Sequence, residues 1–192
     1  MMHGEYESMR EICNISPSFA PRPISWGSCA ERSGRHYLLL EFHDFESGLP
    51  SPSDFARELA KLHSESSSPN GMFGFHMTTC NGNLPQDNTW TASWETFFSN
   101  GIRSMLALEE KSRGPSKELQ DLSVDLLNKV IPRLLRPLES HGRAVKPSLL
   151  HGDLWVGNVA TDKATRQPVI FDSSAYYGHH ECQCLISKLV QF

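Results

Sequence analysis

The sequence has no long hydrophobic run and no excess of positive charge. Its longest apolar stretch is the short region from Tyr37 to Phe42, far below the roughly 20 residues that span a bilayer, and its start lacks the apolar core of a signal peptide. The 18 Lys and Arg residues are outnumbered by 22 Asp and Glu residues, giving a formal net charge of −4. This composition disfavours nucleic acid and anionic membranes as partners. We therefore expect a soluble, cytoplasmic protein that acts on a small or modestly charged substrate.

Paired cysteines are also missing. The five cysteines are odd in number and form no C-x-x-C pair, at Cys13, Cys29, Cys80, Cys182 and Cys184. This pattern indicates neither a disulfide framework nor a zinc site. The neighbouring pair His179-His180 does not change this, because its spacing to Cys182 and Cys184 matches no standard zinc pattern. A reducing compartment is the expectation.

The common phosphate-binding loops are absent as well. Neither G-x-G-x-x-G nor G-x-x-x-x-G-K-[ST] occurs anywhere in the 192 residues. These loops cradle phosphates with backbone amides. A nucleotide-binding site in this chain would therefore have to use other residues to hold the phosphates.

What is present is an ordinary globular composition, 39% hydrophobic and 21% charged, in a chain long enough for one domain. The first half predicts a helix from Gly4 to Cys13, which the prolines after Ser16 end. Strand-like runs follow at residues 24–27 and 37–42, and we expect them to pair as a hairpin. A helix is predicted from the Ser51–Asp54 start signal to His63.

The second half predicts an ordered loop over residues 73–88 and then two long helices. Aromatic and aliphatic residues recur at helical spacing from Trp94 to Leu106, and again from Leu119 to Leu134. Pro132 should kink the second helix or mark its last turns. Short β-type runs follow at residues 148–150, 159–161 and 168–172.

Two acids and one amide follow these short strands at an informative spacing. Residues 151–158 read H-G-D-L-W-V-G-N, and Asp172 ends an apolar strand fourteen residues after Asn158. Phosphoryl transfer from ATP requires a carboxylate that accepts the proton of the attacking hydroxyl, and oxygen ligands that hold magnesium against the phosphates. Asp153, Asn158 and Asp172 supply these groups. The plainer interpretation is that they cap turns, as Asp and Asn often do in loops.

The motif resembles the fructosamine kinase family, which includes the ketosamine and protein-ribulosamine 3-kinases. The matching residues are H-G-D-L-W-x-G-N-V and V-I-F-D-x-x-x-x-Y-G-H-x-E. The resemblance implies that Asp153 is the catalytic base and that Asn158 and Asp172 bind Mg²⁺ beside ATP. It implies that His151 supports the catalytic loop, and that Glu181 is a structural or substrate-side acid.

Three further segments share the resemblance. Residues 4–9 are similar to the family's αC-like helix, which makes Glu5 the acid expected to pair with an ATP-binding lysine; a solvated helix face is the alternative. Residues 37–44 are similar to the last small-lobe strand and the hinge, where the backbone near Glu41 and Phe42 would bind adenine. Trp90 falls in a segment at the mouth of the acceptor site, although aromatic residues are more often part of the core.

The resemblance implies an α/β (α+β) protein-kinase-like fold with residues 1–46 as a remnant of the small lobe and hinge. Residues 47–192 would form a mainly helical large lobe. A glycine-rich hairpin and a strand lysine should precede the αC-like helix, and the sequence contains neither. The residues after Glu181 also depart from the family pattern. We therefore expect a chain truncated at both ends.

The implied function is ATP-dependent phosphorylation of the sugar 3-hydroxyl of ketosamines on protein lysines, leading to deglycation. The acceptor is a glycated protein lysine or a small ketosamine; the choice between ribulosamine and fructosamine stays open, as does the oligomeric state. One alternative is an inactive pseudokinase or gene-model fragment of this family, because the lysine and glycine loop are missing. Another is an aminoglycoside- or choline-type kinase, which shares the H-G-D, Asn and Asp chemistry.

Overall fold

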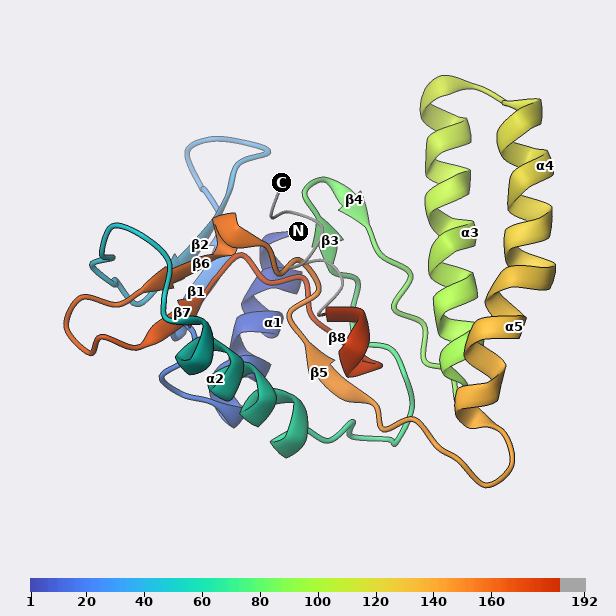
Figure 1. Cartoon of the computed structure of the whole chain (residues 1–192). Helices are drawn as coiled ribbons and strands as arrows, with labels where there is room; N and C mark the ends of the chain where they lie inside the picture. The colour runs from blue at the N-terminus through green and yellow to red at the C-terminus, as the bar shows by residue number, and fades with distance from the viewer. Residues whose placement is uncertain (184–192) are drawn as a thin grey trace.

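The computed structural model describes residues 1–183, a mixture of helices and short antiparallel strand pairs (Figure 1). The main helices are α1 (Met2–Ile15), α2 (Pro52–Glu65), α3 (Trp94–Arg113), α4 (Lys117–Asp125) and α5 (Ile131–Leu135). The strands are β1 (Pro23–Ser28), β2 (His36–Leu40), β3 (Cys80–Asn81), β4 (Leu84–Pro85), β5 (Ser148–Leu150), β6 (Val159–Thr161), β7 (Pro168–Ile170) and β8 (Tyr176–Gly178). Within residues 1–183 these strands form four two-stranded sheets, which pair β1 with β2, β3 with β4, β5 with β8 and β6 with β7.

The predicted first helix and hairpin are confirmed, with one correction. Helix α1 begins and ends two residues beyond the predicted bounds, and β1 pairs with β2 in antiparallel register. The strand was expected to run to Phe42, but it ends at Leu40, opposite Pro23 at the start of β1. Because the partner strand starts there, the ladder has no further residues to pair, and Phe42 lies 87% exposed.

The predicted loop over residues 73–88 contains a small hairpin. β3 and β4 pair through Asn81 and Leu84. Gly82 takes the first turn position with φ of +58°, a left-handed conformation that a two-residue hairpin turn requires and that glycine adopts without strain. The loop interpretation was therefore incomplete.

The second pair of predicted helices forms a long antiparallel hairpin at one side of the molecule (Figure 1). A π-helical turn, Leu126–Val130, separates α4 from α5, and Pro132 lies in the first turn of α5. Proline has no N–H to donate to the carbonyl four residues earlier, so the helical hydrogen-bonding pattern changes just before it. Pro132 was expected to kink the second helix or mark its last turns, and it lies in the short last helix of this arm.

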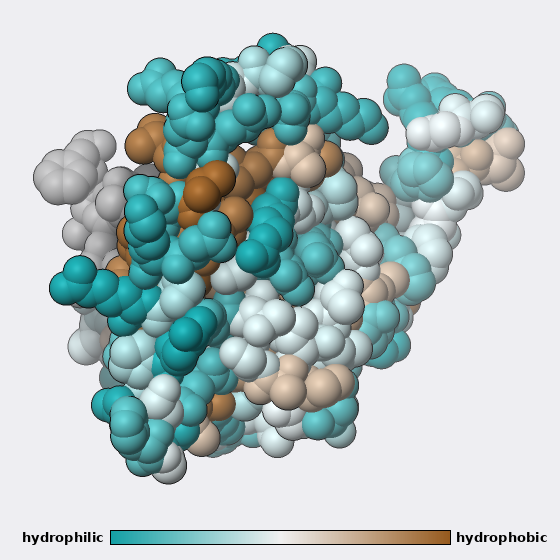
Figure 2. Space-filling view, turned by 90° about the vertical axis from the view of Figure 1, so that its right-hand side faces the viewer, coloured by the Kyte–Doolittle hydropathy of each residue, from teal (hydrophilic) through white to brown (hydrophobic). Residues whose placement is uncertain are grey.

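This helical hairpin leaves many apolar side chains in solvent. Figure 2 looks onto the side of the molecule that carries this helical hairpin. Hydrophobic residues gather in the upper part of this face, below a hydrophilic region at its top. The exposed apolar residues of its second arm are Leu119, Leu122, Val124, Leu126, Val130 and Leu134. Helix α4 contributes no buried residue, so its contacts within the described chain are few.

The main hydrophobic core lies between α1, α2 and the strands that carry the chemical motif. It joins Met9 and Ile12 of α1, Leu62 of α2, Leu149 of β5 and Ile170 of β7. The core thus draws on residues from both sides of the predicted boundary at residue 46; the division into lobes stays a prediction. No helix in the described part of the chain is long and apolar enough to cross a membrane.

Candidate active site

The loop at residues 151–158, named the catalytic loop after its predicted role, connects β5 to β6 and includes a short 3₁₀ turn, Val156–Asn158. Its tight path depends on Gly152, which has φ of +83°. A Cβ at this position would lie 2.1 Å from the backbone oxygen of Ser174. Only glycine fits this backbone conformation and this close approach. The segment after Asp172 therefore packs directly against the loop that carries Asp153.

His151 is fully buried and joins the two segments that carry the acids. Its Nε2 lies 2.9 Å from the carbonyl oxygen of Phe171, while its Nδ1 accepts the Asp153 backbone N–H at 3.3 Å. A carbonyl needs a donor, so the proton resides on Nε2. Burial lowers the His151 pKa to about 4, and the ring is neutral at pH 7. The role expected for His151, support of the loop, agrees with these contacts.

Asn158 closes the loop back onto Asp153. Its Nδ2 donates to the Asp153 backbone oxygen at 2.9 Å and lies 3.4 Å from Asp153 Oδ2. This arrangement commits the amide nitrogen to the loop and leaves the amide oxygen available for another partner. Burial raises the pKa of Asp153, the Asn158 hydrogen bond lowers it, and nearby Asp172 raises it further.

Asp172 follows β7 in a left-handed backbone conformation, with φ of +56°. Non-glycine residues rarely adopt such a conformation, and those that do are found more often at functional sites than elsewhere. Ser173 and Ser174 hold the turn, since the Ser173 hydroxyl and the Ser174 N–H both donate to the His151 carbonyl at 2.9 Å. The two acid-bearing segments are thus hydrogen-bonded to each other on both sides of His151.

Asp153, Asn158 and Asp172 line one cleft of about 410 Å³. The remaining lining residues are Met1, Met2, Glu5, Cys80, Gly82, Trp155 and Ser173. The three residues that the sequence assigned to chemistry therefore lie together, although Asp172 is distant from the loop in sequence. Glu5 joins them from α1.

The Glu5 carboxyl group faces Asp172. Its pKa is raised to about 7, first by burial and then by the charge of Asp172 and a hydrogen bond between the two carboxyl groups. A protonated Glu5 can donate to Asp172, whereas two ionised carboxylates at this separation repel each other. Glu5 was expected to pair with a lysine; the structure instead places it beside an acid that was assigned to magnesium.

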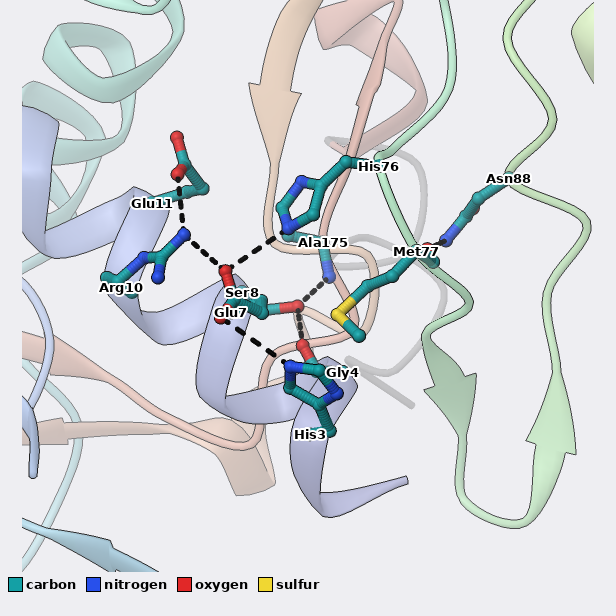
Figure 3. Close-up of polar contacts among 10 residues, drawn as sticks. All are labelled: His3, Gly4, Glu7, Ser8, Arg10, Glu11, His76, Met77, Asn88 and Ala175. Carbon is teal, nitrogen blue, oxygen red and sulfur yellow. Dashed lines mark hydrogen bonds and ion pairs between the residues drawn. The ribbon is translucent and has the colours of Figure 1, made fainter. Parts of the chain in front are cut away.

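Helix α1 is anchored next to this site by two neighbouring residues (Figure 3). The hydroxyl of buried Ser8 accepts the Ala175 backbone N–H at 2.9 Å and donates to Gly4 oxygen at 2.8 Å. Glu7, also buried, forms an ion pair with Arg10 and lies 3.2 Å from His76 Nε2. The Ser8 bond to Ala175 ties the helix, and with it Glu5, to the segment that follows Asp172, while the Glu7 contact ties it to the loop that carries His76.

The other predicted site residues lie outside the group of described residues that line the cleft. Glu41 and Phe42 are exposed just beyond β2, with the Glu41 N–H donating to Arg22 oxygen at 2.9 Å. Trp90 packs on the core, its ring centroid 6.2 Å from that of Tyr177. Glu181 is exposed in a helical turn at residues 180–183. Their functional roles stay predictions.

Several cleft residues escaped the sequence-based assignment. Trp155, Cys80 and Gly82 line the cleft, and Gly152 permits the loop path. Trp155 and Gly152 lie inside the motif, so their position beside Asp153 was a usable signal. Cys80 and Gly82 lie on the small β3–β4 hairpin far away in sequence, and only the fold brings them to Asp153.

The oxygen atoms that Asp172 and Asn158 offer to the cleft fit a hard cation such as Mg²⁺, provided that a bound nucleotide supplies further oxygen ligands. Mg²⁺ is commonly bound by one or two carboxylates together with phosphate oxygens and water, and the cleft offers the Asp172 carboxylate and the Asn158 amide oxygen. Within residues 1–183, no three His, Cys, Asp or Glu side chains are placed to hold a metal ion by themselves. A cation here would therefore depend on phosphate oxygens as further ligands.

Comparison with known proteins adds independent information. The family model for fructosamine kinase matches residues 1–191. A ketosamine-3-kinase of Mus musculus is 31% identical over 212 aligned residues, covering 98% of this chain and 65% of that protein. A chloroplastic protein-ribulosamine 3-kinase of Oryza sativa is 32% identical over 184 residues, covering 95% of this chain and 51% of that protein. The chain thus spans about half to two thirds of the length of these relatives.

Solved structures confirm the expected kinase-type α+β fold. A crystal structure described as a fructosamine-3-kinase from Haemophilus somnus superimposes with a TM-score of 0.77 at 25% identity, covering all of this chain and 60% of that one. A second, from Thermobifida fusca, gives a TM-score of 0.70 at 23% identity. With the family match over nearly the whole sequence and the motif residues gathered in one cleft, the chain belongs to the fructosamine kinase family.

Proposed function

We propose that this chain carries the catalytic residues of an ATP-dependent kinase that phosphorylates the sugar 3-hydroxyl of ketosamines. The observation that carries the proposal is the convergence of Asp153, Asn158 and Asp172 on one cleft. The names of the relatives, ketosamine-3-kinase and protein-ribulosamine 3-kinase, support the acceptor class.

Asp153 is the proposed general base. Its carboxylate would accept the proton of the attacking sugar hydroxyl, and a positioned base of this kind contributes typically about 10²–10⁴-fold to rate. Because burial raises the Asp153 pKa, the carboxylate is more basic than an exposed aspartate, and it becomes inactive by protonation as pH falls through that raised value. The hydrogen bond from Asn158 fixes the carboxylate orientation in the cleft.

Asn158 and Asp172 would hold Mg²⁺ and, through it, the phosphates of ATP. When bound, Mg²⁺ neutralises charge that develops on the transferring phosphoryl group. The Glu5 pKa is raised first by burial and then by the neighbouring Asp172 carboxylate, so a cation at Asp172 would offset the repulsion between the two groups when both are ionised. The residues of the cleft therefore match a Mg²⁺–nucleotide ligand better than free ATP.

The acceptor is proposed to be a ketosamine on a protein lysine, and phosphorylation of its 3-hydroxyl would destabilise the adduct and lead to deglycation. Trp155 and Gly82 line the cleft together with Asp153, and the acceptor is proposed to bind beside them. These residues present an aromatic surface and a turn without a side chain.

An acceptor panel tests this proposal. Purified chain, ATP and Mg²⁺ would be incubated separately with a ribulosyl-lysine peptide, a fructosyl-lysine peptide, the unglycated peptide, kanamycin and choline. The proposal predicts phosphate transfer to one or both ketosamines, none to the unglycated peptide, and loss of transfer when EDTA is added. Transfer to kanamycin or choline alone would contradict the acceptor class, and Mg²⁺–ATP binding without any transfer would indicate a pseudokinase.

A further inference from the structure

The hinge segment, residues 41–46, is fastened at its far end to the β6–β7 hairpin. Phe45 and Asp162 form an isolated antiparallel bridge. The Glu46 N–H donates to Thr161 oxygen at 2.9 Å, and the Lys163 N–H donates to Asp44 oxygen at 2.8 Å. The hinge segment is therefore held to this hairpin by one antiparallel bridge and the two backbone hydrogen bonds beside it.

One side-chain pair reinforces this contact from within the protein. His43 Nδ1 lies 2.8 Å from Asp162 Oδ2, and the two side chains are 18% and 7% exposed. The other carboxylate oxygen of Asp162 accepts the Thr165 N–H at 2.7 Å and the Thr165 hydroxyl at 2.8 Å. These two bonds, with a smaller contribution from His43, lower the Asp162 pKa to about 2. The ionised carboxylate therefore joins the turn of the hairpin to the hinge segment.

The bond to Asp162 determines which nitrogen of the His43 ring carries the proton. An ionised carboxylate only accepts hydrogen bonds, so His43 Nδ1 carries the proton. His43 Nε2 is buried and has no hydrogen-bond partner in the described part of the chain. Asp162 is thus the group that orients the ring.

The hairpin held in this way carries both proposed magnesium ligands. Asn158 immediately precedes β6, and Asp172 follows β7 by two residues. The aromatic ring of Phe45 stacks on that of Phe171, with centroids 5.2 Å apart and planes at 15°. In addition to the backbone bridge, two ring contacts hold the hinge segment: His43 contacts the turn of the hairpin, and Phe45 contacts the residue beside Asp172.

We propose that His43 and Asp162 are positioning residues that set the place of the hinge segment relative to Asn158 and Asp172. The inference rests on the proposed function, in which the backbone near residues 41 and 42 contacts adenine while Asn158 and Asp172 hold the phosphate end through Mg²⁺. A nucleotide that spans both places binds tightly only when their separation is fixed. Neither His43 nor Asp162 has to touch the nucleotide.

Two variants of similar size isolate the hydrogen bond. Asparagine at position 43 can place an N–H donor near the position of Nδ1, whereas leucine has a comparable volume and no donor. Both lose the ring, so the difference between His43→Asn and His43→Leu reports the bond to Asp162. Lys163→Ala is the matched control on the same hairpin, because it removes an exposed ion pair to Asp44.

The measurements are Mg²⁺–ATP dissociation by titration, KM and kcat for ATP, and amide hydrogen exchange of residues 43–46. The proposal predicts that His43→Leu raises the dissociation constant and KM about tenfold, as loss of a charge-assisted hydrogen bond would, with kcat within twofold. The Glu46 amide should exchange faster in His43→Leu. His43→Asn and Lys163→Ala should stay close to the parent chain in all these measurements.

Equal behaviour of His43→Leu and His43→Asn would overturn the proposal, as would a lower melting temperature of His43→Leu with unchanged ATP affinity. Failure of the parent chain to bind Mg²⁺–ATP would refute the proposed function and the role in nucleotide binding together. Hydrogen exchange would then still decide, by itself, whether the His43–Asp162 bond fastens the hinge segment.

Discussion

Replacing Gly152 with alanine would impose two separate costs on the catalytic loop. Its φ of +83° is unfavourable for any residue with a Cβ, at about 1–2 kcal/mol. In addition, the new Cβ would lie 2.1 Å from Ser174 oxygen, so the loop and the segment after Asp172 must move apart. Gly142 has φ of +78°, and a Cβ there would meet no other atom within 4 Å. Gly142→Ala therefore carries the first cost alone.

Urea unfolding followed by circular dichroism separates these costs. We expect Gly142→Ala to lower the free energy of unfolding by about 1–2 kcal/mol, and Gly152→Ala to lower it by roughly 2–5 kcal/mol, because overpacking adds about 1–3 kcal/mol. Gly152→Ala should also abolish any transfer activity, since Asp153 is the next residue. Equal destabilisation by the two variants would refute the close packing of the catalytic loop on Ser174.

Three other predictions follow from the environment of the cleft. Because the Glu5 pKa is raised, the folded chain binds more protons than the unfolded chain between about pH 4.5 and 7, and its stability falls as pH rises through this window. Glu5→Gln should flatten this part of the pH–stability profile and stabilise the protein by ~1–2 kcal/mol at pH 8, allowing for partial solvent exposure. Urea unfolding at several pH values measures both effects. Ser8→Ala leaves the buried Ala175 N–H without its acceptor and should cost about 1–3 kcal/mol in the same assay. Ser123→Ala removes an exposed hydrogen bond within α4 and should change stability by less than about 0.5 kcal/mol. Similar values for the two variants would contradict the anchoring of α1. Asn158→Ala should raise the Mg²⁺ concentration needed for half-maximal nucleotide binding at least about tenfold, and an unchanged requirement would remove Asn158 from the proposed metal site.

The catalytic loop could be predicted from the sequence because its chemistry is local. Asp153 and Asn158 are five residues apart, and a tight loop with a glycine brings both to the same place. The helices were predictable for a similar reason, since apolar spacing and proline positions act within one or two turns. The change from α4 to α5 at Pro132 is one example, because proline has no backbone N–H for the helical hydrogen bond.

The arrangement of distant segments could not be predicted in this way. The proximity of Glu5 to Asp172 depends on how α1 packs, through Ser8, against the segment after Asp172, and no local pattern contains that contact. The pairing of His43 with Asp162 likewise joins residues 119 positions apart. The small β3–β4 hairpin was missed although Asn81-Gly82 is a turn signal, because its strands have two residues each and no alternating pattern.

Asp153 is the proposed base in phosphoryl transfer to a ketosamine. The most direct measurement is transfer of the γ-phosphoryl group from ATP to a ribulosyl-lysine peptide, comparing the parent chain with Asp153→Asn and with the exposed helix variant Asp121→Asn. We expect 3-phosphorylated product from the parent chain and from Asp121→Asn, with a rate at least about 10²-fold lower for Asp153→Asn. Equal rates for Asp153→Asn and the parent chain, or no product from folded parent chain that binds Mg²⁺–ATP, would contradict this expectation.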